Sequence, residues 1–126
     1  MRRATSRVTI DRVAIRNIAQ AQIRALEKTA EALHTEVVQA QVVPFGEGTL
    51  QNESFFVDYS RSNNGIVTLV FSTPYARRLY FHPEYNYSKE ENIHAGGKWL
   101  QHWIDGDNKD FVVNTYKQFF RRESGV

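Results

Sequence analysis

The chain has 126 residues, of which 41% are hydrophobic and 24% are charged, a composition typical of one globular domain. It contains no cysteine, which excludes disulfide bonds and thiolate metal sites. No apolar run approaches the roughly 20 residues that a transmembrane helix needs, and no apolar segment follows the first arginines as it would in a secretory signal. We therefore expect synthesis in the cytoplasm and no membrane partner.

Charge is distributed unevenly along the chain. The net charge is +2, yet residues 1–25 hold six arginines against one aspartate, so the remainder is net acidic. We interpret residues 1–10 as a basic arm in which Arg2, Arg3 and Arg7 could face DNA or an acidic partner. These arginines lack the interleaved aromatic residues of a stacking platform for nucleic acid, and arginine is also common on solvated helix faces. Both interpretations of the arm stay open.

A long helix is predicted from Asp11, which can serve as its N-cap, because no proline or glycine follows before Pro44. Apolar residues spaced by three or four form one stripe, namely Ala19, Ile23, Leu26, Ala30, Leu33 and Val37. The stripe indicates a face that packs on a core. An intermolecular coiled coil is the weaker interpretation, because the repeat lasts less than three heptads.

A β-hairpin is predicted after the Pro/Gly-rich break. Residues 54–60 and 66–71 alternate in polarity, and Asn64–Gly65 between them is a strong hairpin signal. One face of each strand is apolar, with Phe55, Val57 and Tyr59 on the first and Val67, Leu69 and Phe71 on the second. Because a lone hairpin is only marginally stable in water, we expect this face to pack on the long helix.

Residues 98–104 predict a short helix, with a strand as the alternative, and residues 109–122 predict a final helix capped by Asp107 or Asn108. The expected inner face of the final helix is Phe111, Val112, Thr115, Tyr116, Phe119 and Phe120. The fold class is therefore α+β, with residues 11–126 as a single domain. It combines a long N-terminal helix packed on a small antiparallel sheet built on a hairpin, an extended aromatic loop, and a C-terminal helix.

Residues 72–87 hold four tyrosines, one phenylalanine, two prolines and two arginines. Because Pro74 and Pro83 lack a backbone donor and disfavour helix at the preceding residue, we predict an extended loop. A chain of this size can bury only some of these rings, and Tyr and Arg are enriched in interfaces. We therefore predict a contact surface, with a well-packed loop lid as the alternative. The residues assigned to a subunit interface are Tyr75, Arg77, Arg78, Tyr80, His82, Tyr85, Tyr87, Trp99 and Trp103.

Catalytic motifs are absent from the sequence. It has no glycine-rich phosphate loop, no nucleophile elbow, and no Ser, His and acidic grouping that the predicted fold would bring together. We predict that the protein is not an enzyme and binds no cofactor, metal or small-molecule substrate. Metal ligands would have to come from His82, His94 and His102 with Glu84, Glu90 or Asp105. The spacing of eight between the last two histidines is not that of a helical ligand pair, so we favour surface or interface histidines over a metal-dependent hydrolase.

Three segments together resemble a family of small virion proteins of tailed bacteriophages, the minor capsid or head–tail connector (neck, tail-completion) proteins. They are residues 44–50 with Ser54, residues 73–86 with their Tyr-Ala start, and residues 95–100 followed by Trp103. The resemblance spans most of residues 20–120.

This resemblance implies a structural protein of the virion, made in the bacterial host cytoplasm, that forms a homo-oligomeric ring between the DNA-filled head and the tail. Its partners would be sister copies and other neck, connector and tail proteins, and it could also contact phage DNA nonspecifically. A ring built by rotation uses heterologous contacts, so we expect the 74–87 loop of one copy to lie on the hairpin or long helix of the next. The alternative is a DNA-binding protein that uses the basic arm.

Overall fold

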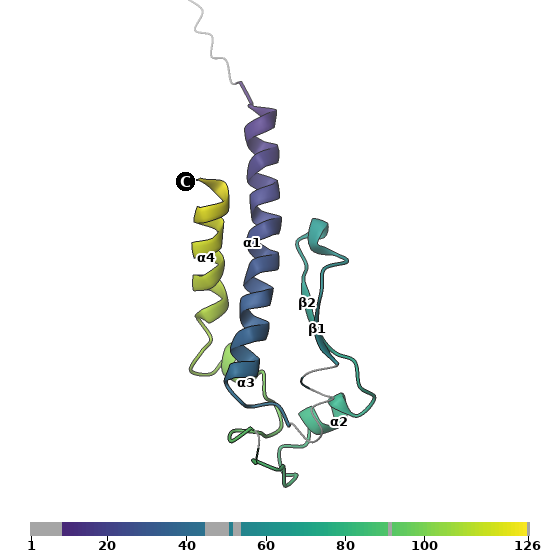
Figure 1. The fold of residues 1–126 in the computed structure, drawn as a ribbon. Helices are drawn as coiled ribbons and strands as arrows, with labels where there is room; N and C mark the ends of the chain where they lie inside the picture. The colour runs from purple at the N-terminus through teal and green to yellow at the C-terminus, as the bar shows by residue number, and fades with distance from the viewer. Residues whose placement is uncertain (1–8, 45–50, 52–53, 91, 126) are drawn as a thin grey trace, which may run out of the picture.

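The computed structural model describes residues 9–44, 51, 54–90 and 92–125. Its elements belong to the predicted α+β class (Figure 1). In chain order they are α1 (Arg12–Gln39), β1 (Phe55–Asp58), the 3-10 turn η2 (Ser62–Asn64), β2 (Thr68–Phe71), α2 (Ala76–Tyr80), α3 (Gln101–Ile104) and α4 (Phe111–Ser124).

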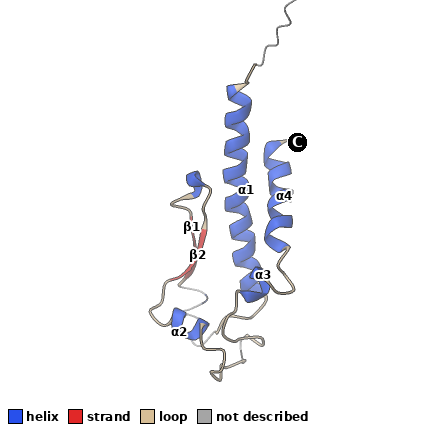
Figure 2. Cartoon of the chain, turned by 180° about the vertical axis from the view of Figure 1, so that it is seen from behind, coloured by secondary structure: helices blue, strands red, loops and turns tan. Residues whose placement is uncertain are grey.

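Helix α1 is the central element of the fold. Helix α4 runs antiparallel along one side of α1, and the β1–β2 hairpin lies on the other side (Figures 1 and 2). The short helices α2 and α3 and the loops between them gather at the C-terminal end of α1. The N-terminal end of α1 extends past both the end of α4 and the tip of the hairpin (Figure 1).

The start of α1 agrees with the prediction. The carboxylate of Asp11 accepts hydrogen bonds from the backbone N–H groups of Val13 and Ala14, at 3.1 and 3.0 Å. An N-cap of this kind stabilises a helix by about 1 kcal/mol. Past the helix end, Gln41 adopts a positive φ of 57°, and the chain turns toward Pro44.

Burial along α1 differs from the single predicted stripe. Ala30 and Val37 of that stripe are buried, whereas Ala19 is exposed. A second set of small side chains is also buried, namely Ala21, Ala25 and Thr29, spaced by four residues. The reason is that α1 is covered from two sides, and the sequence pattern was interpreted as one face only.

The two strands form within the predicted ranges, and the hairpin packs on α1 as expected. Phe55 pairs with Phe71, and Val57 pairs with Leu69, so the apolar faces of the two strands coincide. The ring of Phe55 lies between the rings of Phe71 and His34, with centroid distances of 4.0 and 4.1 Å. A nitrogen of His34 also contacts the carbonyl oxygen of Phe55 at 3.1 Å. Gly65 ends the turn with a positive φ of 79°, which is why glycine suits this position.

The core lies where the C-terminal end of α1 meets β1, α2 and α3. Trp99 is its largest member and is only 2% exposed. Its ring makes edge contacts with Phe71 and Tyr80, at centroid distances of 5.3 and 4.8 Å. The buried cluster comprises Val37, Val42, Val43, Phe55, Ala76, Trp99 and Trp103.

The segment between α2 and α3 covers this core beyond the C-terminal end of α1. The backbone N–H groups of His94 and Gly96 donate to the carbonyl oxygens of Gln41 and Val42, at 3.0 and 3.2 Å. The buried amide of Asn92 donates to the carbonyl oxygen of Val43 at 2.7 Å. These bonds attach the segment to the chain that leaves α1.

The predicted cap of the final helix is wrong. Asp110 occupies the N-cap position of α4, without a side-chain cap bond, in place of Asp107 or Asn108. The reason is that Asn108 belongs to the preceding turn, where its N–H donates to the carbonyl oxygen of His102 at 2.9 Å. At its other end, α4 is tied to α1 through Glu123, whose carboxylate accepts from Arg24 and Lys28.

Candidate subunit interface

Residues 72–87 are not wholly extended, because they contain helix α2. Pro74 lies just before the N-cap residue Tyr75, where its missing N–H removes no helical hydrogen bond. The N–H of Ala76 then bonds to the carbonyl oxygen of Thr73 at 3.2 Å, and the helix ends before Pro83. The two prolines therefore bound a short helix, whereas we had predicted that they exclude one.

The turn after α2 is held by side-chain contacts. The hydroxyl of Tyr87 donates to the carbonyl oxygens of Leu79 and His82, the second at 2.8 Å. The His82 ring stacks on Tyr85 with a centroid distance of 4.6 Å, and its Nδ1 lies 2.6 Å from a carboxylate oxygen of Glu84. The turn that carries Tyr85 is thus positioned by its own chain.

An exposed group of rings and guanidinium groups covers this region. Its exposed members are Tyr75, Arg77, Arg78, Phe81 and Tyr85, and with the half-buried His82 they form what we call the aromatic surface. The most exposed ring is Phe81, at 55%. The guanidinium of Arg77 lies 5.4 Å from the centre of the Phe81 ring, and that of Arg78 lies 5.9 Å from the centre of Tyr85. Cation–π contacts of this kind hold the arginines beside the rings.

Phe81 was not among the residues predicted for the interface. Phe81 lies within the aromatic segment. The signal in the sequence that could have assigned it to the interface was its position directly before His82 and Pro83. Helix α2 ends at Tyr80, and the helix end turns the side chain of Phe81 outward. The prediction of an extended loop gave no reason to expect this orientation.

Four predicted interface residues lie inside the chain, to different degrees. Tyr80 and Tyr87 are half-buried beneath the aromatic surface. Trp99 and Trp103 are buried in the core and expose no useful area to a neighbour, so we exclude them from the aromatic surface. The reason is that α3 turns this segment inward beneath α1. The indole N–H groups of both tryptophans have no hydrogen-bond partner among the described residues.

The pKa values of four ionisable groups in this region differ from their ordinary values. The hydrogen bond from His82 holds the pKa of Glu84 below its ordinary value. Burial raises the pKa values of the Tyr80 and Tyr87 hydroxyls. The bond to Tyr85 raises the pKa of Arg78. A general acid or base works best with a pKa near the working pH, and these four groups move in the opposite direction.

The candidate metal ligands are spread over the molecule. His94 and His102 both line a shallow pocket beside Trp103, whereas His82 pairs with Glu84 elsewhere. In the part of the chain that the structure describes, no three His, Asp or Glu side chains gather as a metal site would require. The predicted arm residues Arg2, Arg3 and Arg7 lie outside the described residues.

Comparison with family models, with curated proteins and with solved structures finds no match to this chain. Among the described residues, no helix is both long and apolar enough to cross a membrane.

Proposed function

We propose that the protein is a structural virion subunit of a tailed bacteriophage, a minor capsid protein that forms a homo-oligomeric ring at the head–tail connector. The observation that supports this most is the aromatic surface. The rings of Phe81 and Tyr85 are held by contacts within the chain and are nevertheless exposed. Such a surface suits a permanent contact with another protein molecule.

The physical argument rests on preorganisation. Fully burying one side chain of this size contributes about 1.5–3 kcal/mol. Tyr85 stacks on His82 and contacts Arg78, and Phe81 contacts Arg77, so little conformational freedom remains to be lost on association. Binding surfaces that are ordered before association lose less entropy when they bind.

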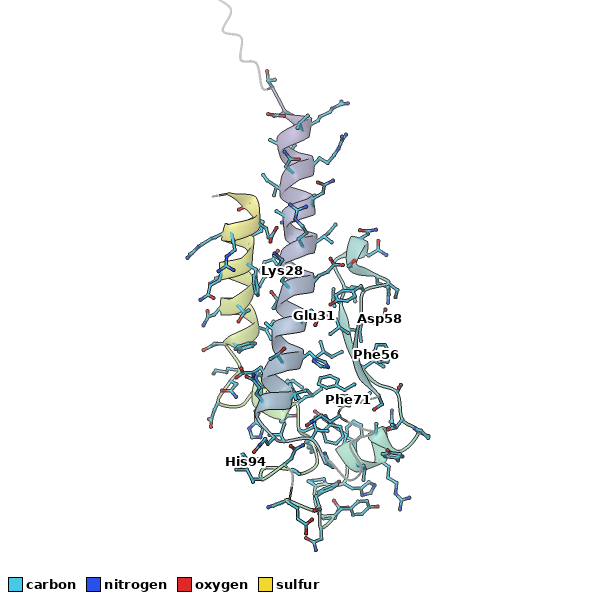
Figure 3. The ribbon with its side chains drawn as sticks, in the orientation of Figure 1. Lys28, Glu31, Phe56, Asp58, Phe71 and His94 are labelled. Carbon is cyan, nitrogen blue, oxygen red and sulfur yellow. The ribbon has the colours of Figure 1, made fainter. Side chains whose placement is uncertain are left out.

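The hairpin of a neighbouring copy offers a suitable partner surface. Phe56 is 45% exposed on the hairpin face that points away from α1 (Figure 3). A contact between the aromatic surface of one copy and the hairpin of the next joins two different patches. Repeated by rotation, such a heterologous contact produces a ring when the rotation closes and an open filament when it does not, and the proposal requires the first outcome.

Measuring the mass of the purified protein in solution, and imaging the particles by electron microscopy, tests this proposal. We expect a closed ring with a central channel, and we expect Phe81→Ala with Tyr85→Ala to shift the mass toward the monomer. Ile104→Ala is the matched control, because Ile104 is also an exposed apolar residue but lies on α3. A protein that stays monomeric at all concentrations, or a ring that the double variant leaves unchanged, contradicts the proposal.

A further inference from the structure

The N-terminal end of α1 is a helix end without cover from the described residues. Every residue from Arg12 to Gln20 is exposed, although three of them are Val13, Ile15 and Ile18. The end extends past α4 and the hairpin tip (Figure 1). Short helices without packing are marginal in water, so an apolar helix end of this kind gains stability from a contact with another surface.

Its charges point to an acidic partner. Arg12 and Arg16 lie four residues apart, and the first turn of α1 contains no acidic residue. Positive charge at a helix N-terminus is unfavourable because it faces the positive end of the helix dipole. Two like charges spaced by four residues add a further small repulsion. The Asp11 carboxylate at the N-cap offsets part of this cost, and a neighbouring carboxylate pair would offset more of it.

A groove lined by a pair of carboxylates lies at mid-length on α1. It encloses about 570 Å³ between the hairpin and α4, and it is lined by Glu27, Lys28, Glu31, Ala32, Thr35, Tyr59 and Phe119. Lys28 and Arg24 share the single carboxylate of Glu123, so the two further carboxylates of Glu27 and Glu31 leave this part of α1 with an excess of negative charge. Glu31 accepts a hydrogen bond from the Tyr59 hydroxyl, which leaves the carboxylate its negative charge. Lys28 and Glu31 are labelled in Figure 3.

We propose that the N-terminal end of α1 of one copy packs into this groove of a second copy, with Arg12 and Arg16 facing Glu27 and Glu31. This inference rests on the homo-oligomer proposed above and adds a second contact to it, separate from the aromatic surface. The two pairs have the same spacing of four residues, about 6 Å along a helix. Val13 lies beside Arg16, about 60° around the helix axis, and meets the rings of Tyr59 and Phe119.

The arginine pair and the glutamate pair must come from different copies. Arg12 and Glu27 lie on the same straight helix, 15 residues or about 22 Å apart, so they cannot meet within one chain. Duplex DNA is the competing partner for the arginines. The phosphate groups of DNA attract the positive charge of a protein and make no use of its apolar side chains. The apolar side chains on the same helix end fit a protein groove better, so we favour a second copy.

Charge reversal tests the pairing. One variant carries Arg12→Glu and Arg16→Glu, and the other carries Glu27→Lys and Glu31→Lys. Each variant alone places like charges in the contact, and we expect its assembly to weaken by about tenfold or more. An equimolar mixture should restore assembly, because each reversed end then meets a groove of opposite charge. Lys109→Glu with Lys117→Glu is the control, since both lysines are exposed and lie outside the groove.

Sedimentation velocity and native mass spectrometry measure the assemblies, and circular dichroism checks the helix content of each variant. A monomeric wild type overturns both this inference and the proposed function. A wild-type oligomer that neither variant weakens overturns this inference alone, as does a mixture that restores nothing. Loss of duplex DNA retention in the Arg12→Glu, Arg16→Glu variant, with the oligomer intact, assigns the arginines to nucleic acid and also overturns it.

Discussion

The two ends of α1 carry similar side chains and have opposite surroundings. Val37 near the C-terminal end is fully buried in the core, whereas Val13 near the N-terminal end is 63% exposed. The difference comes from the covering elements and not from α1 itself. Helix α4 ends near Arg24, where Glu123 contacts it, and the hairpin tip at Gly65 reaches the same part of α1. The covered end stabilises the fold, and no other element among the described residues packs on the opposite end.

Substituting the same residue type at both ends gives the largest expected difference. Val37→Ala removes buried methyl groups from the core and should lower the free energy of unfolding by about 2–3 kcal/mol. Val13→Ala should change it by less than about 0.5 kcal/mol, because alanine is the better helix former at an exposed position. Urea unfolding below the assembly concentration measures both values. Equal losses for the two variants would contradict the contrast between the ends.

The segment beneath the covered end of α1 also makes a close backbone approach, at Gly97. A Cβ added at Gly97 would lie 2.7 Å from the Cα of Pro83, whereas one added at Gly96 would meet nothing within 4 Å. We expect Gly97→Ala to lower the free energy of unfolding by about 1–2 kcal/mol, because backbone must move to accept the methyl group.

Gly96→Ala is the matched control for that substitution. It should be neutral or slightly stabilising, since alanine restricts the unfolded chain without a clash in the folded one. The same unfolding measurement compares the two variants. If Gly96→Ala proved as costly as Gly97→Ala, the segment beneath α1 would not pack on Pro83 as described.

Local signals in the sequence predicted the elements that depend on neighbours along the chain. The Asp11 cap, the long helix and the apolar faces that carry Phe55 and Phe71 all follow from cap chemistry and alternation. The α2 helix was missed because the effect of a proline on the residue before it was applied to the whole segment. A proline permits a helix in the residues that follow it. The segment between Pro74 and Pro83 was long enough for a short helix.

The candidate interface was harder to predict because burial depends on distant segments. Tyr85 and Trp99 belong to the same aromatic-rich part of the sequence, yet one ring is exposed and the other is 2% exposed. Trp99 is buried only because β2 supplies Phe71 and α2 supplies Tyr80 around it. No local pattern predicts that convergence. The groove between Tyr59 and Phe119 also joins residues that are far apart in the sequence.

The smallest expected effect concerns Glu123, which marks the place where the cover of α1 stops. Hydrogen bonds from Lys28 and then Arg24 lower the pKa of its carboxyl below the ordinary value. A carboxyl with a lower pKa in the folded state stabilises that state above its unfolded pKa, and this contribution is lost as the pH falls through the folded value. Glu123→Gln cannot ionise at this position. The wild type should therefore lose more stability than the variant between about pH 5 and pH 3.

High salt should shrink this difference, because Arg24 and Lys28 are partly exposed and their charges are screened. Urea unfolding midpoints of both proteins at pH 7 and pH 3, with and without salt, measure it. A stability gap that is the same at both pH values would mean that Glu123 acts through packing alone. In that case, α4 would be held against α1 by its apolar face without the help of the ion pair.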